Sequence, residues 1–192
     1  MTSLVAGLAV FLGVHSLRIF ADDWRTQRIA RIGVVAWKGV YAAASLLGIV
    51  LVAYGFELSR QAPVDLWFPP SWTRPLATLL TLPIFVLLAA AYVPGTRIKA
   101  AVKHPMVVGV AIWAVAHLLS NGRLGEIVLF TAFLSWAILD FRSSRQRDRK
   151  EGTIYSAAGL SRDFAAIAAG FGAWVAFAFY LHGALIRVPL VG

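Results

Sequence analysis

Long apolar stretches separated by short polar connections dominate the chain. A helix that crosses a bilayer needs about 20 mostly apolar residues, and six stretches approach or reach this length. The fourth and fifth are short and are joined by a tight turn. The pattern therefore predicts six transmembrane helices, near residues 4–20, 34–56, 76–93, 106–120, 127–141 and 164–188.

Turn-forming residues stand where these stretches begin or end. The pair Pro94-Gly95 follows the third stretch, and Asn121-Gly122 follows the fourth. Pro105 falls in the first turn of the fourth stretch, where the missing N–H of proline costs little. These positions support the boundaries that hydropathy alone suggests.

Composition leads to the same fold class. Hydrophobic residues make up 59% of the 192 residues and charged residues 14%, with a mean hydropathy of +0.74. Soluble domains carry roughly 25% charged residues, and a soluble fold of this size cannot hide so much apolar surface. We therefore predict an all-α fold, a polytopic transmembrane helix bundle that forms one domain over residues 1–192.

The basic residues predict the orientation of this bundle. Most of the 18 lysines and arginines lie in the first, third and fifth connections, and few lie in the second and fourth. Cytoplasmic loops carry the excess of Lys and Arg, so both termini are expected on the outer (periplasmic) side of a bacterial inner (cytoplasmic) membrane. Residues 142–163 form the longest basic cytoplasmic loop. The net charge of +9 thus reports topology, and no nucleic-acid partner is expected beside the lipid bilayer.

The chain has no cysteine, which excludes disulfides, thiolate metal sites and cysteine nucleophiles. No catalytic triad, no phosphate-binding glycine loop and no carboxylate in the interior of a predicted span is found, since Asp140 lies at the very end of the fifth. Small residues such as Gly170 and Gly172 permit close helix contacts within or between chains. The sequence therefore allows a homo-oligomer and does not decide the oligomeric state.

Ionisable residues inside spans are costly and therefore mark candidate functional positions. His15 lies in the first span, and Arg18 follows it on the same helix face. An imidazole on iron with a guanidinium on a propionate suits haem. An interhelical hydrogen bond from His15 is the alternative.

His117 lies late in the fourth span, between Trp113 and Asn121 at four-residue spacing. All three share one helix face, where Trp113 can pack on a flat ring and Asn121 can orient the imidazole. Gly109 extends this face and would let a planar ligand approach the backbone, although ordinary helix packing also explains a glycine there.

Three further residues complete the set. His104 begins the fourth span at the membrane interface, where it is either a solvated side chain or a ligand. Lys38 lies in the second span with Tyr41 on its face. It is expected either to be a counter-ion to a carboxylate or propionate or to snorkel. His182, near the outer end of the sixth span, is expected at the interface. Several histidines without carboxylates favour haem over zinc or di-iron.

Several motifs in order resemble the NnrU family of membrane proteins. They are GLAVFLGVHSLRI, GVVAWKGVYAAASLLGIVLVAYGFELSR, WFPPSW, AAYVPGTRIKAAVKHPMVVGVAIWAVAHLLSNG and LFTAFLSWAILDFRSSRQRD, between about Gly7 and Arg149. NnrU proteins resemble the plant 15-cis-ζ-carotene isomerase, a haem b enzyme that moves a cis double bond to trans without net redox change.

The resemblance implies haem b (iron) with His15 and His117 as ligands and His104 as a required neighbour. It also implies a cis–trans isomerase of a polyene or other apolar small molecule, or a haem protein of nitrogen-oxide metabolism and denitrification. The isomerase has a cysteine, proposed as an alternative iron ligand, where this chain has Ala114.

Two sets of alternatives stay open. In the predicted topology His117 lies roughly 20 Å above the cytoplasmic boundary, at 1.5 Å per residue, whereas His15 lies about one turn from it. The pairs His15/His104 and His117/His182 match better in depth. The segment KHPMVVG also resembles the cofactor-binding segment of isoprenylcysteine and phospholipid methyltransferases that use S-adenosylmethionine, and a non-catalytic haem sensor or assembly factor is a further hypothesis.

Overall fold

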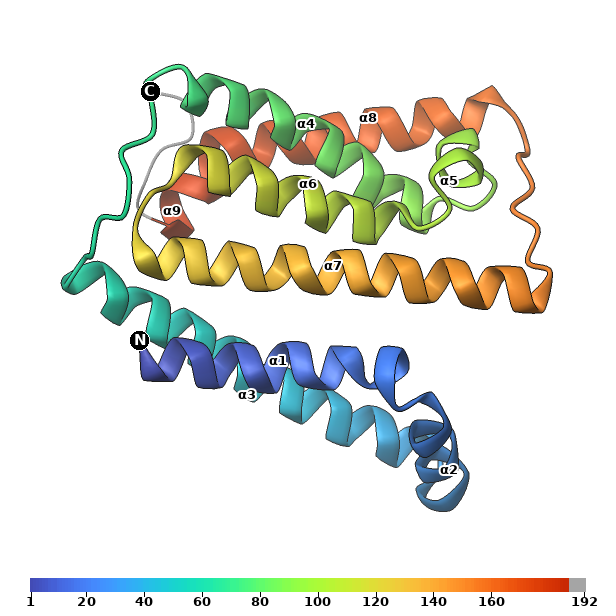
Figure 1. The fold of residues 1–192 in the computed structure, drawn as a ribbon. Helices are drawn as coiled ribbons and strands as arrows, with labels where there is room; N and C mark the ends of the chain where they lie inside the picture. Colours follow the sequence, from blue (N-terminus) through green and yellow to red (C-terminus); the bar gives the residue numbers. More distant parts are fainter. Residues whose placement is uncertain (187–192) are drawn as a thin grey trace. The chain divides into compact units, whose positions relative to one another are not determined.

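The computed structural model describes residues 1–186, and this part of the chain is built from helices, with a single isolated bridge between Asp65 and Arg123 in place of any strand. The all-α prediction is confirmed (Figure 1). The elements are α1 (Thr2–Phe20), α2 (Asp22–Ile32), α3 (Val34–Gln61), α4 (Thr73–Tyr92), α5 (Arg97–Val102), α6 (Pro105–Ser120), α7 (Leu124–Glu151), α8 (Leu160–Ala176), the π-helix η1 (Phe177–Leu181) and α9 (His182–Ile186).

Every predicted span falls on a helix. Five helical stretches are long and apolar enough to cross a membrane, whereas α6 is apolar but only 16 residues long. The protein is therefore a membrane-embedded helical protein. The count of six spans and the outer position of both termini stay predictions, and the last residues of the span predicted at 164–188 lie outside the described residues. The five stretches are Thr2–Phe20, Val34–Gln61, Thr73–Tyr92, Leu124–Glu151 and Leu160–Leu185.

Segments expected as connections also form helices. The first connection is α2, whose first turn carries Asp22 and Asp23 and whose last turn carries Arg31, a distribution that complements the helix dipole. The basic loop expected at 142–163 is helical as far as Glu151. Arginine, glutamine and lysine favour helix, and hydrogen bonds one turn apart, such as Arg147 to Ser143 at 2.7 Å, add to this preference.

The chain divides into two compact units. The N-terminal unit comprises residues 1–68 and 121–140, and the C-terminal unit comprises residues 69–120 and 141–192, described as far as residue 186. Helix α7 contributes its apolar first part to the N-terminal unit and its polar end to the C-terminal unit. Each unit contains one or more of the histidines singled out above.

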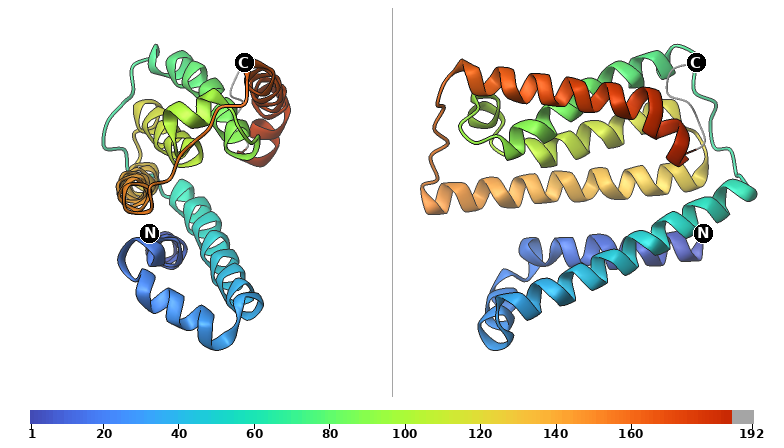
Figure 2. Two further views of the ribbon diagram at one scale, coloured as in Figure 1. Left: turned by 90° about the vertical axis from the view of Figure 1, so that its right-hand side faces the viewer. Right: turned by 180° about the vertical axis from the view of Figure 1, so that it is seen from behind.

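Glycines bring α1 and α3 into backbone contact in the N-terminal unit (Figure 2). A Cβ on Gly7 would lie 2.5 Å from the backbone nitrogen of Val52, and a Cβ on Gly48 would lie 2.7 Å from that of Phe11. Gly55 faces Leu4 in the same way. These pairs run in opposite directions along the two helices, so α1 and α3 are antiparallel in a fixed register.

In the C-terminal unit, α4 packs against both α6 and α8 (Figures 1 and 2). Gly170 of α8 approaches the backbone of Val86, where an added Cβ would meet it at 2.6 Å. One turn further, the indole nitrogen of Trp174 donates a 2.8 Å hydrogen bond to the hydroxyl of Thr81. Close backbone packing and one polar link thus hold α8 on α4.

The turn between α4 and α5 is tied to the start of α8. Asp163, 8% exposed, accepts hydrogen bonds from the amides of Arg97 and Ile98 at 2.7 and 3.4 Å. Gly95, with φ of +72°, offers its carbonyl to the amide of Ala158 at 2.8 Å. The first turn of α5 is therefore fixed from outside its own helix.

Gly48→Ala should destabilise the N-terminal unit, because the new methyl group cannot fit between α1 and α3. Overpacking of this kind costs about 1–3 kcal/mol, measured as a lower melting temperature of the purified protein in detergent. Gly39→Ala is the matched control on the same helix, since nothing lies within 4 Å of its Cβ position. Equal melting temperatures for the two variants would contradict the packing described here.

Candidate functional site

His15 has a defined tautomer in the N-terminal unit. Its Nδ1 lies 2.6 Å from the backbone oxygen of Phe11, one turn earlier on α1. A carbonyl oxygen can only accept, so Nδ1 carries the proton and donates it. In the neutral ring, Nε2 is then the nitrogen with the lone pair.

Aromatic rings surround this imidazole. The ring centroid of His15 lies 4.2 Å from that of Phe11, 5.2 Å from Tyr41 and 6.1 Å from Trp136. These residues come from α1, α3 and the first part of α7. The structure therefore brings Tyr41 next to His15 and adds Trp136, which the sequence analysis did not single out.

Two buried polar atoms lie on the same helices as this cluster. The Nε1 of Trp136 and the Oγ of Ser45, one turn after Tyr41 on α3, are buried and have no hydrogen-bond partner within residues 1–186. Buried polar atoms normally have a partner. The helices around His15 thus carry donor capacity that the described part of the protein does not use.

The two cations predicted beside His15 lie nearer to the helix ends. Arg18 is exposed in the last turn of α1, three residues after His15. Lys38 is exposed, as the fifth residue of α3, and makes no ion pair with any described residue. Both positions place a positive charge at the same end of the α1–α3 pair, on the side where α2 joins the two helices.

His117 repeats the geometry of His15 in the C-terminal unit. Its Nδ1 lies 2.8 Å from the backbone oxygen of Trp113, and the two ring centroids are 5.1 Å apart. Nδ1 is again the donor. Gly109, on the same helix, packs against Ile84 and Leu87 of α4, with contacts of 3.6–3.7 Å from its Cβ position, so helix packing accounts for this glycine. Asn121 follows the last residue of α6.

His182 begins α9, directly after the π-helix η1. Its ring lies 5.6 Å from that of Phe177, and it is near enough to His117 for the two imidazoles to interact electrostatically. π-Helical turns occur frequently at functional sites. The electrostatic interaction makes His182 a neighbour of His117 within the C-terminal unit.

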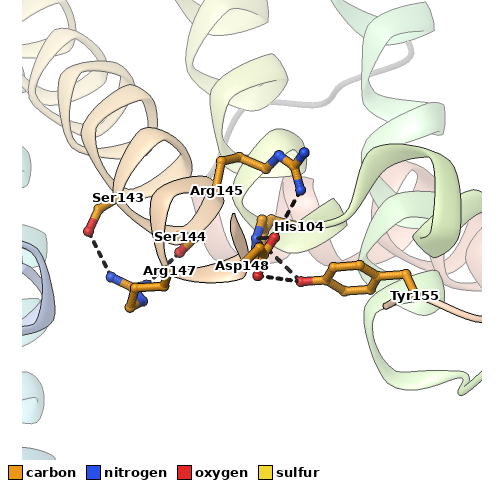
Figure 3. A network of polar contacts seen from close by, with 7 residues as sticks. All are labelled: His104, Ser143, Ser144, Arg145, Arg147, Asp148 and Tyr155. Atoms are coloured by element: carbon orange, nitrogen blue, oxygen red, sulfur yellow. Dashed lines mark hydrogen bonds and ion pairs between the residues drawn. The ribbon is translucent and has the colours of Figure 1, made fainter. Parts of the chain in front are cut away.

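His104 belongs to a network of charged and polar groups at the start of α6 (Figure 3). Its Nε2 lies 2.8 Å from Asp148 Oδ2, an oxygen that also accepts a 3.0 Å hydrogen bond from Arg145. The hydroxyl of Tyr155 donates to the other oxygen of Asp148 at 3.0 Å. The network ties α6, the polar end of α7 and the following loop together.

This network sets the protonation of Asp148, which lies on the polar end of α7 beyond its apolar stretch. Burial raises the pKa of Asp148, but the hydrogen bonds it accepts, that of His104 first, outweigh burial, so its pKa lies below the ordinary 3.8. Burial and then the neighbouring carboxylate raise the pKa of Tyr155 above 10.0. Asp148 is therefore ionised and Tyr155 is a neutral donor at neutral pH.

Sequence reasoning found His104 but missed its partners. Asp148 is an acid inside a strongly basic segment, and this contrast is the one local signal that it pairs with something. Tyr155 gives no such signal. Both lie more than forty residues from His104, so that only the tertiary structure reveals the contact.

The donor set restricts the metal chemistry that the described residues can support. No group of three or more His, Asp or Glu side chains in residues 1–186 is placed to hold a metal ion. The candidate ligands are single imidazoles on apolar helices. A metal that brings its own equatorial ligands, as haem iron does, needs only such axial donors.

The fold and these histidines define a membrane-embedded helical protein with isolated imidazoles inside its apolar helices. The family model described as NnrU protein matches residues 3–190, nearly the whole chain. The chain therefore belongs to the NnrU family. No curated protein and no solved structure matches it.

Asp148→Asn should lower the melting temperature at pH 7, because a charged acceptor of three hydrogen bonds is lost, at a cost of about 1–3 kcal/mol. The pKa of Asp148 is lower in the folded than in the unfolded protein. Its contribution is therefore complete above the unfolded value and disappears as pH falls through the folded value. The difference from the wild type, measured by thermal unfolding, should shrink below about pH 4.

Glu151→Gln is the control, since Glu151 is exposed at the end of the same helix. A difference between Asp148→Asn and the wild type that stayed constant from pH 7 to the acid limit would show that the carboxylate charge is not what stabilises the network.

Proposed function

We propose that this NnrU protein binds haem b in the membrane, with His15 and His117 as the iron ligands. The observation that carries the proposal is the geometry these two histidines share. Each lies on an apolar helix, donates its Nδ1 proton to the carbonyl of the preceding turn, and packs against the aromatic ring at that position.

This geometry is the one that a metal-binding imidazole requires. A histidine ligand nearly always donates its second ring nitrogen to a carbonyl or carboxylate, which fixes the tautomer and the ring orientation. Here the backbone supplies the acceptor, so Nε2 is the ligating atom in both residues. The same bond satisfies a buried donor in an apolar helix, and it leaves Nε2 of both rings available to a metal.

The surroundings of His15 fit a large planar group with acidic substituents. Phe11, Tyr41 and Trp136 offer flat apolar surfaces. Arg18 and Lys38 carry positive charge beyond the apolar cluster, where propionates reach the membrane boundary. The unpaired Nε1 of Trp136 offers a hydrogen bond to a polar group of the bound molecule.

Haem iron, once bound, supplies a Lewis-acidic centre that polarises the π system of a polyene or binds a nitrogen oxide. The residues of the chain hold the imidazoles, exclude water from the apolar cluster and restrict what can approach. A cis–trans isomerase of an apolar substrate and a haem protein of nitrogen-oxide metabolism are the two activities that follow from this chemistry.

The absorption spectrum of protein purified in detergent from haem-replete cells tests the proposal. The wild type should show a Soret band and the visible bands of low-spin haem b. His15→Ala and His117→Ala should each lose the low-spin spectrum, and added imidazole should restore it, because the small ligand fills the space left by the side chain.

His182→Ala is the matched control, since His182 is the neighbour of His117 that the proposal leaves off the iron. If His182→Ala lost the low-spin spectrum and His15→Ala kept it, the ligand pair would be His117 and His182. A colourless wild-type protein that bound S-adenosylmethionine would replace haem binding with the methyltransferase hypothesis.

A further inference from the structure

The C-terminal unit contains a cavity that the haem proposal does not use. It has a volume of about 160 Å³, whereas one water molecule needs about 10–15 Å³ on the same kind of measure. The cavity lies where α4 ends and α6 begins. Its wall includes Lys99, Lys103 and His104 together with the first turn of α6.

Both lysines are half-buried residues of the cavity wall. The Nζ of Lys99 donates a 3.0 Å hydrogen bond to the carbonyl of Ala91, which also lines the cavity. The Nζ of Lys103 lies 5.3 Å from the ring centroid of Tyr155. Each ammonium group of these two cavity-lining residues is therefore held by a contact within the fold instead of extending freely into water.

The positive charge has no counter-ion in the described residues. Neither Lys99 nor Lys103 forms an ion pair there, and no carboxylate lines the cavity. The nearest acid of the network, Asp148, is already engaged by His104, Arg145 and Tyr155. Two half-buried cations beside apolar helices are costly unless an anion joins them.

The backbone adds donors to the same wall. The amides of Met106 and Val107 stand in the first turn of α6 and have no carbonyl partner among residues 1–186. Such amides and the helix dipole favour an anion. Lys103 adopts φ of +70°, the one positive value among the non-glycine residues described, and this conformation turns the chain from α5 into α6.

We propose that this cavity binds a phosphate group, through Lys99, Lys103 and the first-turn amides of α6. Three or more donors with two full charges suit a phosphate, which has several acceptor oxygens. The other wall residues are apolar, among them Ala91 and Val107, and the cavity lies at the ends of apolar helices. An anionic phospholipid headgroup therefore fits best, and a soluble phosphate compound shares the same chemistry.

Amine acylation of the wild-type protein in neutral detergent, followed by mass spectrometry, tests the site without any substitution. Short-chain phosphatidylglycerol should slow the acylation of Lys99 and Lys103 several-fold and leave the exposed Lys38 and Lys150 unchanged. Short-chain phosphatidylcholine, which carries no net charge, should protect neither pair. Inorganic phosphate that protected Lys99 and Lys103 equally well would assign the site to a soluble phosphate compound. Failure of both anions to protect these lysines would overturn the proposal.

A second measurement uses variants. The double variant Lys99→Gln/Lys103→Gln should bind phosphatidylglycerol at least about tenfold more weakly in native mass spectrometry, because each lost charge removes a charge-assisted hydrogen bond. Arg149→Gln/Lys150→Gln is the control with the same change in net charge, since both side chains are exposed on the polar end of α7. Equal binding by the two double variants would contradict the site. Neither measurement involves haem, so the outcome is separate from that of the spectra proposed above.

Discussion

His15 and His117 are polar residues on apolar helices, where water is scarce as a hydrogen-bond partner. Each buried donor must therefore be satisfied within the chain, or by something bound to it. His15 and His117 meet this constraint through the carbonyl one turn earlier, and this choice settles their tautomers. The chemistry available to the protein follows from that local hydrogen bond, because it leaves Nε2 of each ring as the basic nitrogen.

Close helix packing decides what surrounds these rings. In the N-terminal unit, Gly48 and Gly55 let α1 approach α3 until backbones touch, and the resulting register puts Tyr41 beside His15. In the C-terminal unit, Gly170 gives α8 the same close approach to α4. Small residues thus act as the framework that positions aromatic and imidazole side chains, in a place where no hydrophobic driving force between helices exists.

His104 is held in a different way from His15 and His117. His104 lies where α6 begins and pairs with Asp148, a full charge that Arg145 and Tyr155 also contact. The charge is tolerated there because Asp148 accepts three hydrogen bonds, which compensate for its burial. The same region gathers Lys99 and Lys103 around a cavity, so that the protein keeps His15 and His117 on its apolar helices apart from the charged groups at the helix ends.

Hydropathy and turn-forming residues were sufficient to predict the apolar helices and the histidines worth testing, because a span and its polar exceptions are local properties of the chain. Local pattern also suggested that Tyr41 lies near Lys38 on one face. It could not reveal that α2 and the segment 142–151 are helical, since polar helices give no hydropathy signal. Nor could it pair His104 with Asp148 and Tyr155, or place Trp136 beside His15. Those contacts join residues far apart in sequence, and only the packing of whole helices brings them within reach of one another.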